Sequence, residues 1–128
     1  MKTIAKNEQY ELLVDKLSNR AFLTIKGFWR NEADIPAYLE DWDQAINMLK
    51  PGFTLLTDAT KMSIHPGEVR EIHQKAQKKI ISAGVQKVAE LHSESVAVMQ
   101  LNGLASETQM PKRSFTSKTE ALSWLESA

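Results

Sequence analysis

The sequence feature that most constrains the fold is a short apolar run from Phe53 to Asp58, which ends in an acid. A run of this length and composition is typical of a strand that is buried on both faces. After a loop comes an amphipathic stretch from Pro66 to Gly84, in which apolar residues recur at helical spacing. A buried strand that leads into a crossover helix indicates an α/β fold.

The segment before this strand is typical of an antiparallel hairpin. The runs Tyr10–Asp15 and Arg20–Lys26 have strand composition, and the connection between them contains the turn signal Ser18-Asn19. Residues 1–9 are polar, and we expect them to form a flexible leader ahead of a single domain at residues 10–128.

A helix is predicted between the hairpin and the buried strand. Asp34 can cap it, Pro51-Gly52 ends it, and its apolar stripe consists of Ile35, Leu39, Trp42, Ile46 and Leu49. The loop that follows the buried strand is expected at residues 59–65.

The C-terminal part continues the alternation of strands and helices. Val85–Leu91 is a predicted strand, a short helix is predicted to start at Ser93 or Ser95, and Arg113–Thr116 is a further short strand. Ser117 and Glu120 then have the spacing of a capping box at the start of a final helix. The predicted fold is a mixed, mostly parallel sheet with an N-terminal antiparallel hairpin and four helices, in the order β-β-α-β-α-β-α-β-α.

Composition narrows the class of partner. The 16 basic and 16 acidic residues give a formal net charge of zero, which disfavours a nucleic-acid partner.

The chain has no cysteine, so disulfides and thiolate metal sites are excluded. No stretch has the roughly 18 consecutive apolar residues of a membrane span. The N-terminus lacks the apolar core of a signal peptide, and a cytoplasmic protein is therefore the expectation.

The chain resembles the SpoIIAA-like, or STAS-like, superfamily. The resemblance rests on the element order, on the strand end Leu55–Asp58, and on the closing pattern from Phe115 to Leu125 with its Ala121-Leu122 and Trp124-Leu125 pairs. It covers residues 10 to 127, and it is closest to a bacterial branch of the superfamily that is grouped with the CRAL-TRIO lipid-binding fold. The resemblance implies a mixed sheet with helices packed around it.

The resemblance also implies a mode of action. Anti-sigma-factor antagonists of this superfamily dock a partner kinase and are switched by phosphorylation of a Ser at the start of the helix after the third strand. Here that position falls on or beside Gly67, and the segment Ile64–Val69 has no hydroxyl group. The nearest hydroxyl groups are those of Thr60 and Ser63, so the phosphorylation switch is not carried over to this chain.

Asp58 is the first candidate site residue, because ligands of α/β sheets gather at the carboxyl ends of strands. Alternatively, its carboxylate accepts hydrogen bonds from the following loop. His65 lies just before a helix start, with Asp58 upstream in the chain, and the two side chains could form a pair that transfers a proton. Ser63 could complete a trio of this kind as the nucleophile. A small anion at the helix start near Gly67 is a further reading. The alternative is that these are ordinary loop residues.

Phe28 and Trp29 follow Gly27 at a strand end, where they can line a pocket or an interface. The alternative is that both pack in the core. His73 and His92 lack the spacing of a metal pair, and no glycine-rich phosphate loop occurs, so we expect no metal and no cofactor.

Three functions are compatible with these residues. The first is a non-catalytic STAS-like module that acts through a protein partner or through self-association, for example as a homodimer. The second is a carrier of a small apolar or lipid-like ligand, for which the apolar segment Leu101–Pro111 would act as a lid or a subunit contact. The third is a small hydrolase that uses Asp58 and His65.

Overall fold

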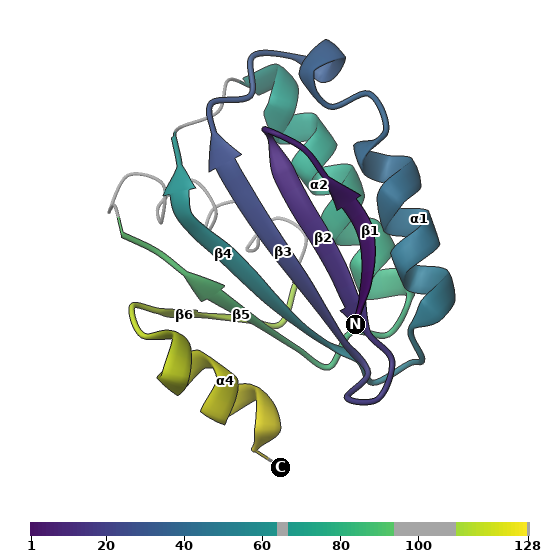
Figure 1. The fold of residues 1–128 in the computed structure, drawn as a ribbon, viewed down its shortest axis with the longest axis vertical. Coiled ribbons are helices and arrows are strands. Elements are labelled where there is room, and N and C mark those ends of the chain that lie inside the picture. The colour runs from purple at the N-terminus through teal and green to yellow at the C-terminus, as the bar shows by residue number, and fades with distance from the viewer. Residues whose placement is uncertain (64–66, 94–109, 128) are drawn as a thin grey trace.

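The computed structural model describes residues 1–63, 67–93 and 110–127. In these residues, six strands form one sheet and lie in it in chain order. The strands are β1 (Lys2–Lys6), β2 (Tyr10–Asp15), β3 (Arg20–Gly27), β4 (Thr54–Met62), β5 (Lys87–Leu91) and β6 (Lys112–Phe115). The helices are the 3₁₀-helix η1 (Glu32–Asp34) and the α-helices α1 (Tyr38–Met48), α2 (Gly67–Ser82) and α4 (Lys118–Glu126) (Figure 1).

The type of strand pairing changes once across the sheet, at β3. β1 pairs with β2 and β2 with β3 in antiparallel fashion, whereas the pairs β3–β4, β4–β5 and β5–β6 are parallel. The predicted N-terminal hairpin and the mostly parallel sheet are therefore confirmed. The turn between β2 and β3 places Asn19 at a φ of 54°, a conformation that Asn tolerates better than most residues.

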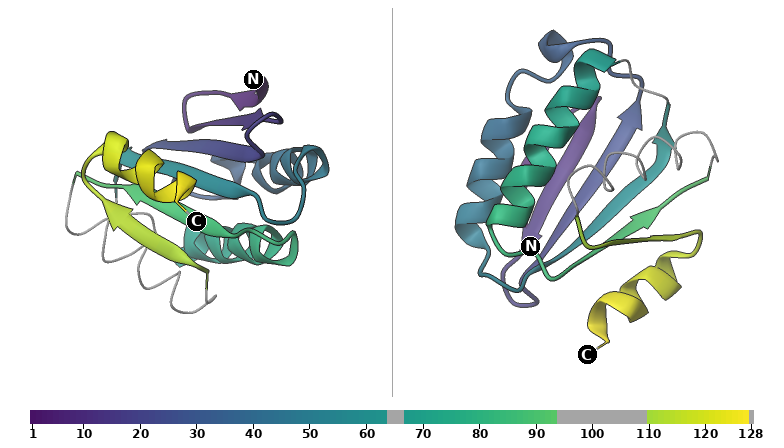
Figure 2. Two further views of the ribbon diagram at one scale, coloured as in Figure 1. Left: turned by 90° about the horizontal axis from the view of Figure 1, so that it is seen from below. Right: turned by 180° about the vertical axis from the view of Figure 1, so that it is seen from behind.

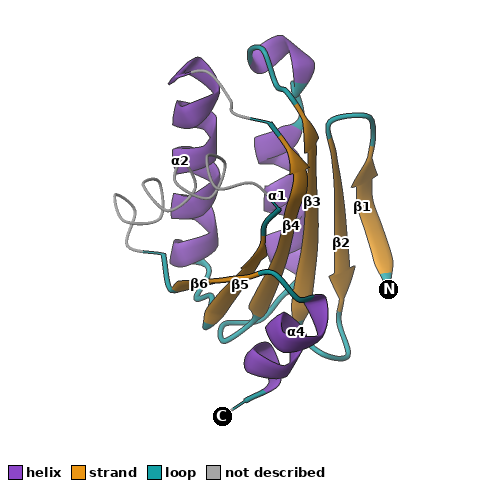
Figure 3. Cartoon of the chain, turned by 90° about the vertical axis from the view of Figure 1, so that its left-hand side faces the viewer, coloured by secondary structure: helices purple, strands orange, loops and turns teal. Residues whose placement is uncertain are grey.

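The helices lie on both faces of the sheet. α1 connects β3 to β4 and α2 connects β4 to β5, and both helices cover the same face (Figures 2 and 3). Two crossovers of the same hand that step in one direction across a parallel sheet place their helices on one face. α4 packs on the opposite face, against β4 and β5. Among the described residues, no helix has the length and apolar character needed to cross a membrane.

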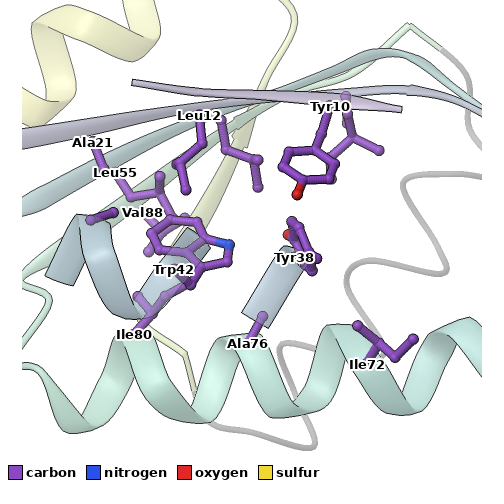
Figure 4. Packing of buried hydrophobic residues seen from close by; sticks show 14 of the residues in the cluster. Tyr10, Leu12, Ala21, Tyr38, Trp42, Leu55, Ile72, Ala76, Ile80 and Val88 are labelled. Atoms are coloured by element: carbon purple, nitrogen blue, oxygen red, sulfur yellow. The ribbon is translucent and has the colours of Figure 1, made fainter. Parts of the chain in front are cut away.

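The main core fills the space between the sheet and the pair α1 and α2. Figure 4 shows Trp42 and Tyr38 of α1 between strand residues such as Leu55 and the α2 residues Ala76 and Ile80. The apolar stripe predicted for the first helix thus faces the core, with Trp42 fully buried. A smaller cluster on the other face consists of Leu56, Ala89, Leu91, Ala121 and Leu125.

Gly84 ends α2 as predicted, and its surroundings explain why. Its φ is +91°, and a Cβ atom at this position would lie 3.1 Å from Cβ of Pro51. A larger residue would therefore be strained and would press on Pro51. The predicted cap of the final helix is also confirmed, because the Ser117 hydroxyl accepts a hydrogen bond from the backbone N–H of Glu120 at 3.4 Å.

Four predictions need correction. Asp34 does not cap the first helix, because Asp34 ends η1 and α1 begins at Tyr38 with Ala37 as its N-cap. Residues 1–9 do not form a flexible leader throughout, because Lys2–Lys6 form β1 and pair with β2 along the sheet edge. The loop expected at residues 59–65 is shorter, because β4 continues to Met62. The described residues contain three α-helices where the sequence predicted four. The remaining predicted helix, at Ser93 or Ser95, falls mostly outside the described residues.

Candidate functional site at the carboxyl ends of the strands

The carboxyl half of β4 contains a bulge that starts at Asp58. Thr24 of β3 pairs with Asp58, and Lys26 pairs with Lys61, so β4 has one more residue than β3 over this stretch. Pairing of β4 with β5 ends at Asp58 and Leu91. Bulges of this kind reorient side chains at the ends of strands, often beside functional sites.

The Asp58 carboxylate binds to the bulge itself. Its Oδ1 atom accepts hydrogen bonds from the backbone N–H of Thr60 at 3.0 Å and from the Thr60 hydroxyl at 2.7 Å. This is the alternative role considered for Asp58, in which the acid stabilises the backbone after it. The proposed partner His65 lies outside the described residues, so the pairing of Asp58 with His65 stays a prediction.

Several predicted residues lie together beyond the bulge. The backbone N–H of Ser63 donates to the carbonyl oxygen of Gly27 at 3.0 Å, which joins the ends of β3 and β4. The hydroxyl of Ser93, which follows β5, donates to the carbonyl oxygen of Thr60 at 2.6 Å. Thr60 and Ser63 are exposed.

Gly67 begins α2 at the same end of the sheet (Figure 1). It is exposed, and no atom lies within 4 Å of the position that a Cβ atom would take. This helix start therefore has room for a side chain or for a contact from outside. We refer to Phe28, Thr60, Ser63 and Gly67 together as the carboxyl edge.

Phe28 and Trp29 are neighbours in the chain but differ in their exposure to solvent. Phe28 is 55% exposed, whereas Trp29 is fully buried. The Trp29 indole N–H donates to the carbonyl oxygen of Gln9 at 3.0 Å, and its ring stacks on His73 with centroids 5.0 Å apart. Trp29 is therefore a core residue, and its place in a ligand or partner surface is corrected. Gly27, at a φ of +61°, turns the chain between β3 and these two aromatics.

A cluster of buried polar side chains joins β5 and β6, and it was not predicted from the sequence. Lys112 Nζ lies 2.7 Å from Glu90 Oε1, and the Lys112 and Glu90 side chains are 5% and 3% exposed. His92 Nε2 lies 3.3 Å from the same Glu90 oxygen and 3.2 Å from Ser114 Oγ. One signal was present in the sequence, because an acid inside the apolar strand Val85–Leu91 requires a partner when buried.

The two tyrosines of the chain are buried beside α1. The Tyr10 hydroxyl donates a hydrogen bond to the Asp41 carboxylate. Burial, with this bond as the next cause, raises the pKa of Tyr10 above its ordinary value. Burial also raises the pKa of Tyr38. Both side chains therefore remain protonated, and they stabilise the core rather than transfer protons near neutral pH.

The chemistry at the carboxyl edge is that of a contact surface. It offers hydroxyl groups, an exposed aromatic ring and an open helix start. Among residues 1–63, 67–93 and 110–127, no group of three or more His, Asp or Glu side chains could hold a metal ion.

Similarity to known proteins is found at the level of the fold. No protein-family model matches the chain, and no curated protein matches it either. An uncharacterized protein from Shewanella loihica, described as having a SpoIIAA-like fold, has a similar structure. It superposes with a TM-score of 0.62 at 15% identity, over 94% of this chain and 97% of that chain.

A second similar structure is an anti-sigma factor antagonist from Mycobacterium paratuberculosis. The TM-score is 0.57 at 13% identity, over 96% of this chain and 99% of that chain. Both likenesses span nearly the whole of each chain. The mixed sheet with helices on both faces agrees with the predicted resemblance. The fold of this chain is therefore SpoIIAA-like.

Proposed function

We propose that this protein is a non-catalytic regulatory module that binds a partner protein through the carboxyl edge. The observation that carries the proposal is the 55% exposure of Phe28, beside two exposed hydroxyl residues and the start of α2. Aromatic side chains that are exposed in the free protein often become the buried anchors of an interface. The similarity in fold to an anti-sigma factor antagonist supports a role that depends on protein contacts.

This module would work without the phosphorylation switch implied by the resemblance. Gly67 has no hydroxyl group at the start of α2. The Thr60 hydroxyl already donates to Asp58, and Ser63 is exposed in the connection to α2. We therefore expect the partner to recognise the unmodified protein.

The test compares two substitutions of exposed apolar residues. Phe28→Ser removes the proposed anchor, and Leu17→Ser is the matched control, because Leu17 is fully exposed in the turn between β2 and β3 at the opposite end of the sheet. A tagged chain is used to isolate its partner from the source cells. The partner is then purified, and its affinity for the three forms is measured by calorimetry.

We expect Phe28→Ser to weaken binding by about tenfold or more, as for an interface anchor, with Leu17→Ser unchanged. Equal binding by all three forms, or loss with Leu17→Ser alone, would contradict the proposal. Sedimentation of the purified chain identifies a second copy as the partner if a dimer forms and Phe28→Ser dissociates it. A monomer that binds no partner would also contradict the proposal.

A second candidate is a carrier of a small apolar ligand, in line with the implied CRAL-TRIO kinship. It is favoured by a recess of about 230 Å³ on the sheet face opposite α1 and α2. The recess lies over β2, β3, β4 and β5, and its wall includes Leu13, Phe22, Leu56, Leu91 and Asp58. The interior between the sheet and α2 offers less room, since the cavity there measures about 30 Å³. The apolar segment Leu101–Pro111 lies almost wholly outside the described residues.

Native mass spectrometry of gently purified protein tests this candidate. A carrier would keep a bound molecule that Phe22→Asp removes and Leu17→Asp retains. A mass that equals the bare chain in every preparation would argue against it. The hydrolase that uses Asp58 and His65 and the cytoplasmic location stay predictions.

A further inference from the structure

A separate pocket lies where the ends of β5 and β6 meet the first turn of α4. Its volume is about 380 Å³, and it is lined by His92, Arg113, Ser114, Phe115, Thr116 and Glu120. This volume lies within the range of small-molecule sites. The pocket is also at the carboxyl ends of parallel strands, where open α/β sheets bind their ligands. We refer to it as the Arg113 pocket.

Two opposite charges share the Arg113 pocket without pairing. Arg113 and Glu120 both line it, yet neither takes part in an ion pair among residues 1–63, 67–93 and 110–127. The Arg113 guanidinium lies over the rings of Phe115 and Trp124, at 5.5 and 6.0 Å from their centroids. These ring contacts limit the motion of the guanidinium group and leave its N–H donors available.

The imidazole of His92 adds a buried polar atom. His92 is 5% exposed, and its Nδ1 atom is buried with no hydrogen-bond partner in the described part of the chain. The other nitrogen, Nε2, lies 3.3 Å from the Glu90 carboxylate. A lone pair on Nε2 would be repelled by that oxygen, so Nε2 carries a proton. The His92 ring is thus a polar group in the wall of the pocket, held by Glu90 and Ser114.

We propose that the Arg113 pocket binds a small zwitterion with one ammonium and one carboxylate group, such as a free α-amino acid. Arg113 would hold the carboxylate with two parallel N–H donors. Glu120 would accept hydrogen bonds from the ammonium group, and the Phe115 ring would contact the apolar part of the molecule. This ligand site shares no residue with the carboxyl edge and adds a small-molecule site to the proposed interaction module.

The first test is a titration of the whole chain, followed by nuclear magnetic resonance. The standard amino acids are added one at a time, and the backbone amide signals of His92, Ser114 and Thr116 are recorded with the side-chain signal of the Arg113 guanidinium group. We expect at least one amino acid to shift all of these signals to saturation. Absence of a saturable shift with every amino acid would overturn the proposal.

The second test separates the two charges of the ligand. For the amino acid that binds best, its methyl ester lacks the carboxylate charge and its deaminated acid lacks the ammonium group. We expect each analogue to bind about tenfold more weakly, because each loses a charge-assisted hydrogen bond. Equal affinity of either analogue would show that the corresponding charge is not recognised, and it would overturn the zwitterion assignment.

The third test uses variants of the exposed charges, which leave the core intact. Arg113→Gln and Glu120→Gln should weaken binding about as much as removal of the matching ligand charge. Lys16→Gln and Glu8→Gln are matched controls, since both residues are exposed at a distance from the pocket. Weakening by the controls as well, or full binding by both pocket variants, would contradict the proposal.

Discussion

The Glu90 carboxylate and the Lys112 ammonium group form a buried ion pair between neighbouring parallel strands. Removal of the Lys112 ammonium group leaves the buried Glu90 carboxylate with the His92 ring at 3.3 Å but without its cation at 2.7 Å. We predict that Lys112→Met lowers the free energy of unfolding by about 3 kcal/mol or more, and that adding Glu90→Gln restores most of the loss. Urea unfolding of the single variants and the double variant measures this coupling. Additive losses would show that the two groups stabilise the fold independently.

Tyr10 and Tyr38 predict how stability depends on alkaline pH. Their pKa values are raised in the folded protein, whereas an unfolded tyrosine ionises at about pH 10. Above that pH the unfolded chain binds fewer protons than the folded protein, so stability is complete below pH 10 and falls as the pH rises. Each tyrosine contributes up to about 1.4 kcal/mol per pH unit to this fall.

Tyr10→Phe should therefore show a shallower alkaline loss than the unsubstituted chain, and Tyr10→Phe combined with Tyr38→Phe a shallower loss still. The measurement is the free energy of unfolding in urea from about pH 8 to about pH 11, around the ordinary tyrosine pKa. Identical slopes in all three forms would refute the assignment of the alkaline loss to these two phenols.

Among the elements, α4 depends on a lysine from another part of the chain. Lys87 Nζ donates to the carbonyl oxygens of Trp124 at 3.0 Å and Ser127 at 2.7 Å, and to the Ser127 hydroxyl at 2.8 Å. A cation at this end of a helix satisfies carbonyl groups that lack partners and interacts favourably with the helix dipole.

We predict that Lys87→Met destabilises the protein by about 1–2 kcal/mol and accelerates hydrogen exchange in α4. Exchange in α2, on the other face of the sheet, should not change. The matched control is Lys118→Met in the first turn of the same helix, where a cation opposes the dipole. Equal acceleration by both variants would indicate that the loss of charge, rather than the cap, is responsible.

At the scale of the whole molecule, the two faces of the sheet differ in the number of apolar side chains that they bury. Leu55 and Leu56 are neighbours in β4, and they are 1% and 4% exposed. Leu55 belongs to the large core under α1 and α2, whereas Leu56 belongs to the small cluster under α4. Adjacent strand residues point to opposite faces, so this pair compares the faces directly.

Leu55→Ala should lower the free energy of unfolding by about 3–5 kcal/mol and increase exchange throughout the protein. Leu56→Ala should cost less and should act first on α4, because few groups hold that helix in place. Urea unfolding combined with hydrogen exchange distinguishes the two outcomes. A local effect of Leu55→Ala, or a global effect of Leu56→Ala, would reverse the proposed roles of the faces.

Local patterns were enough to predict most elements. The run Phe53–Asp58, the stripe that contains Trp42, and the capping box at Ser117 each reflect burial or hydrogen bonding within a few neighbouring residues. Such signals are present in the chain before it folds. β1 was missed because Lys2–Lys6 is an edge strand with mainly exposed side chains, and its pairing with β2 produces no apolar run.

The arrangement of the sites depends on long-range pairing. Asp58, Thr60 and Ser63 could be proposed from the sequence, because they lie at or beyond the end of the apolar run Phe53–Asp58. The bulge that directs Asp58 toward Thr60 arises from the register with β3, and the turn at Gly27 decides that Trp29 is buried while Phe28 is exposed. Glu90 and Lys112 meet only because β5 and β6 are neighbours. A pattern along the chain reports which face of an element is buried, but contacts between distant segments form only when strands align side by side.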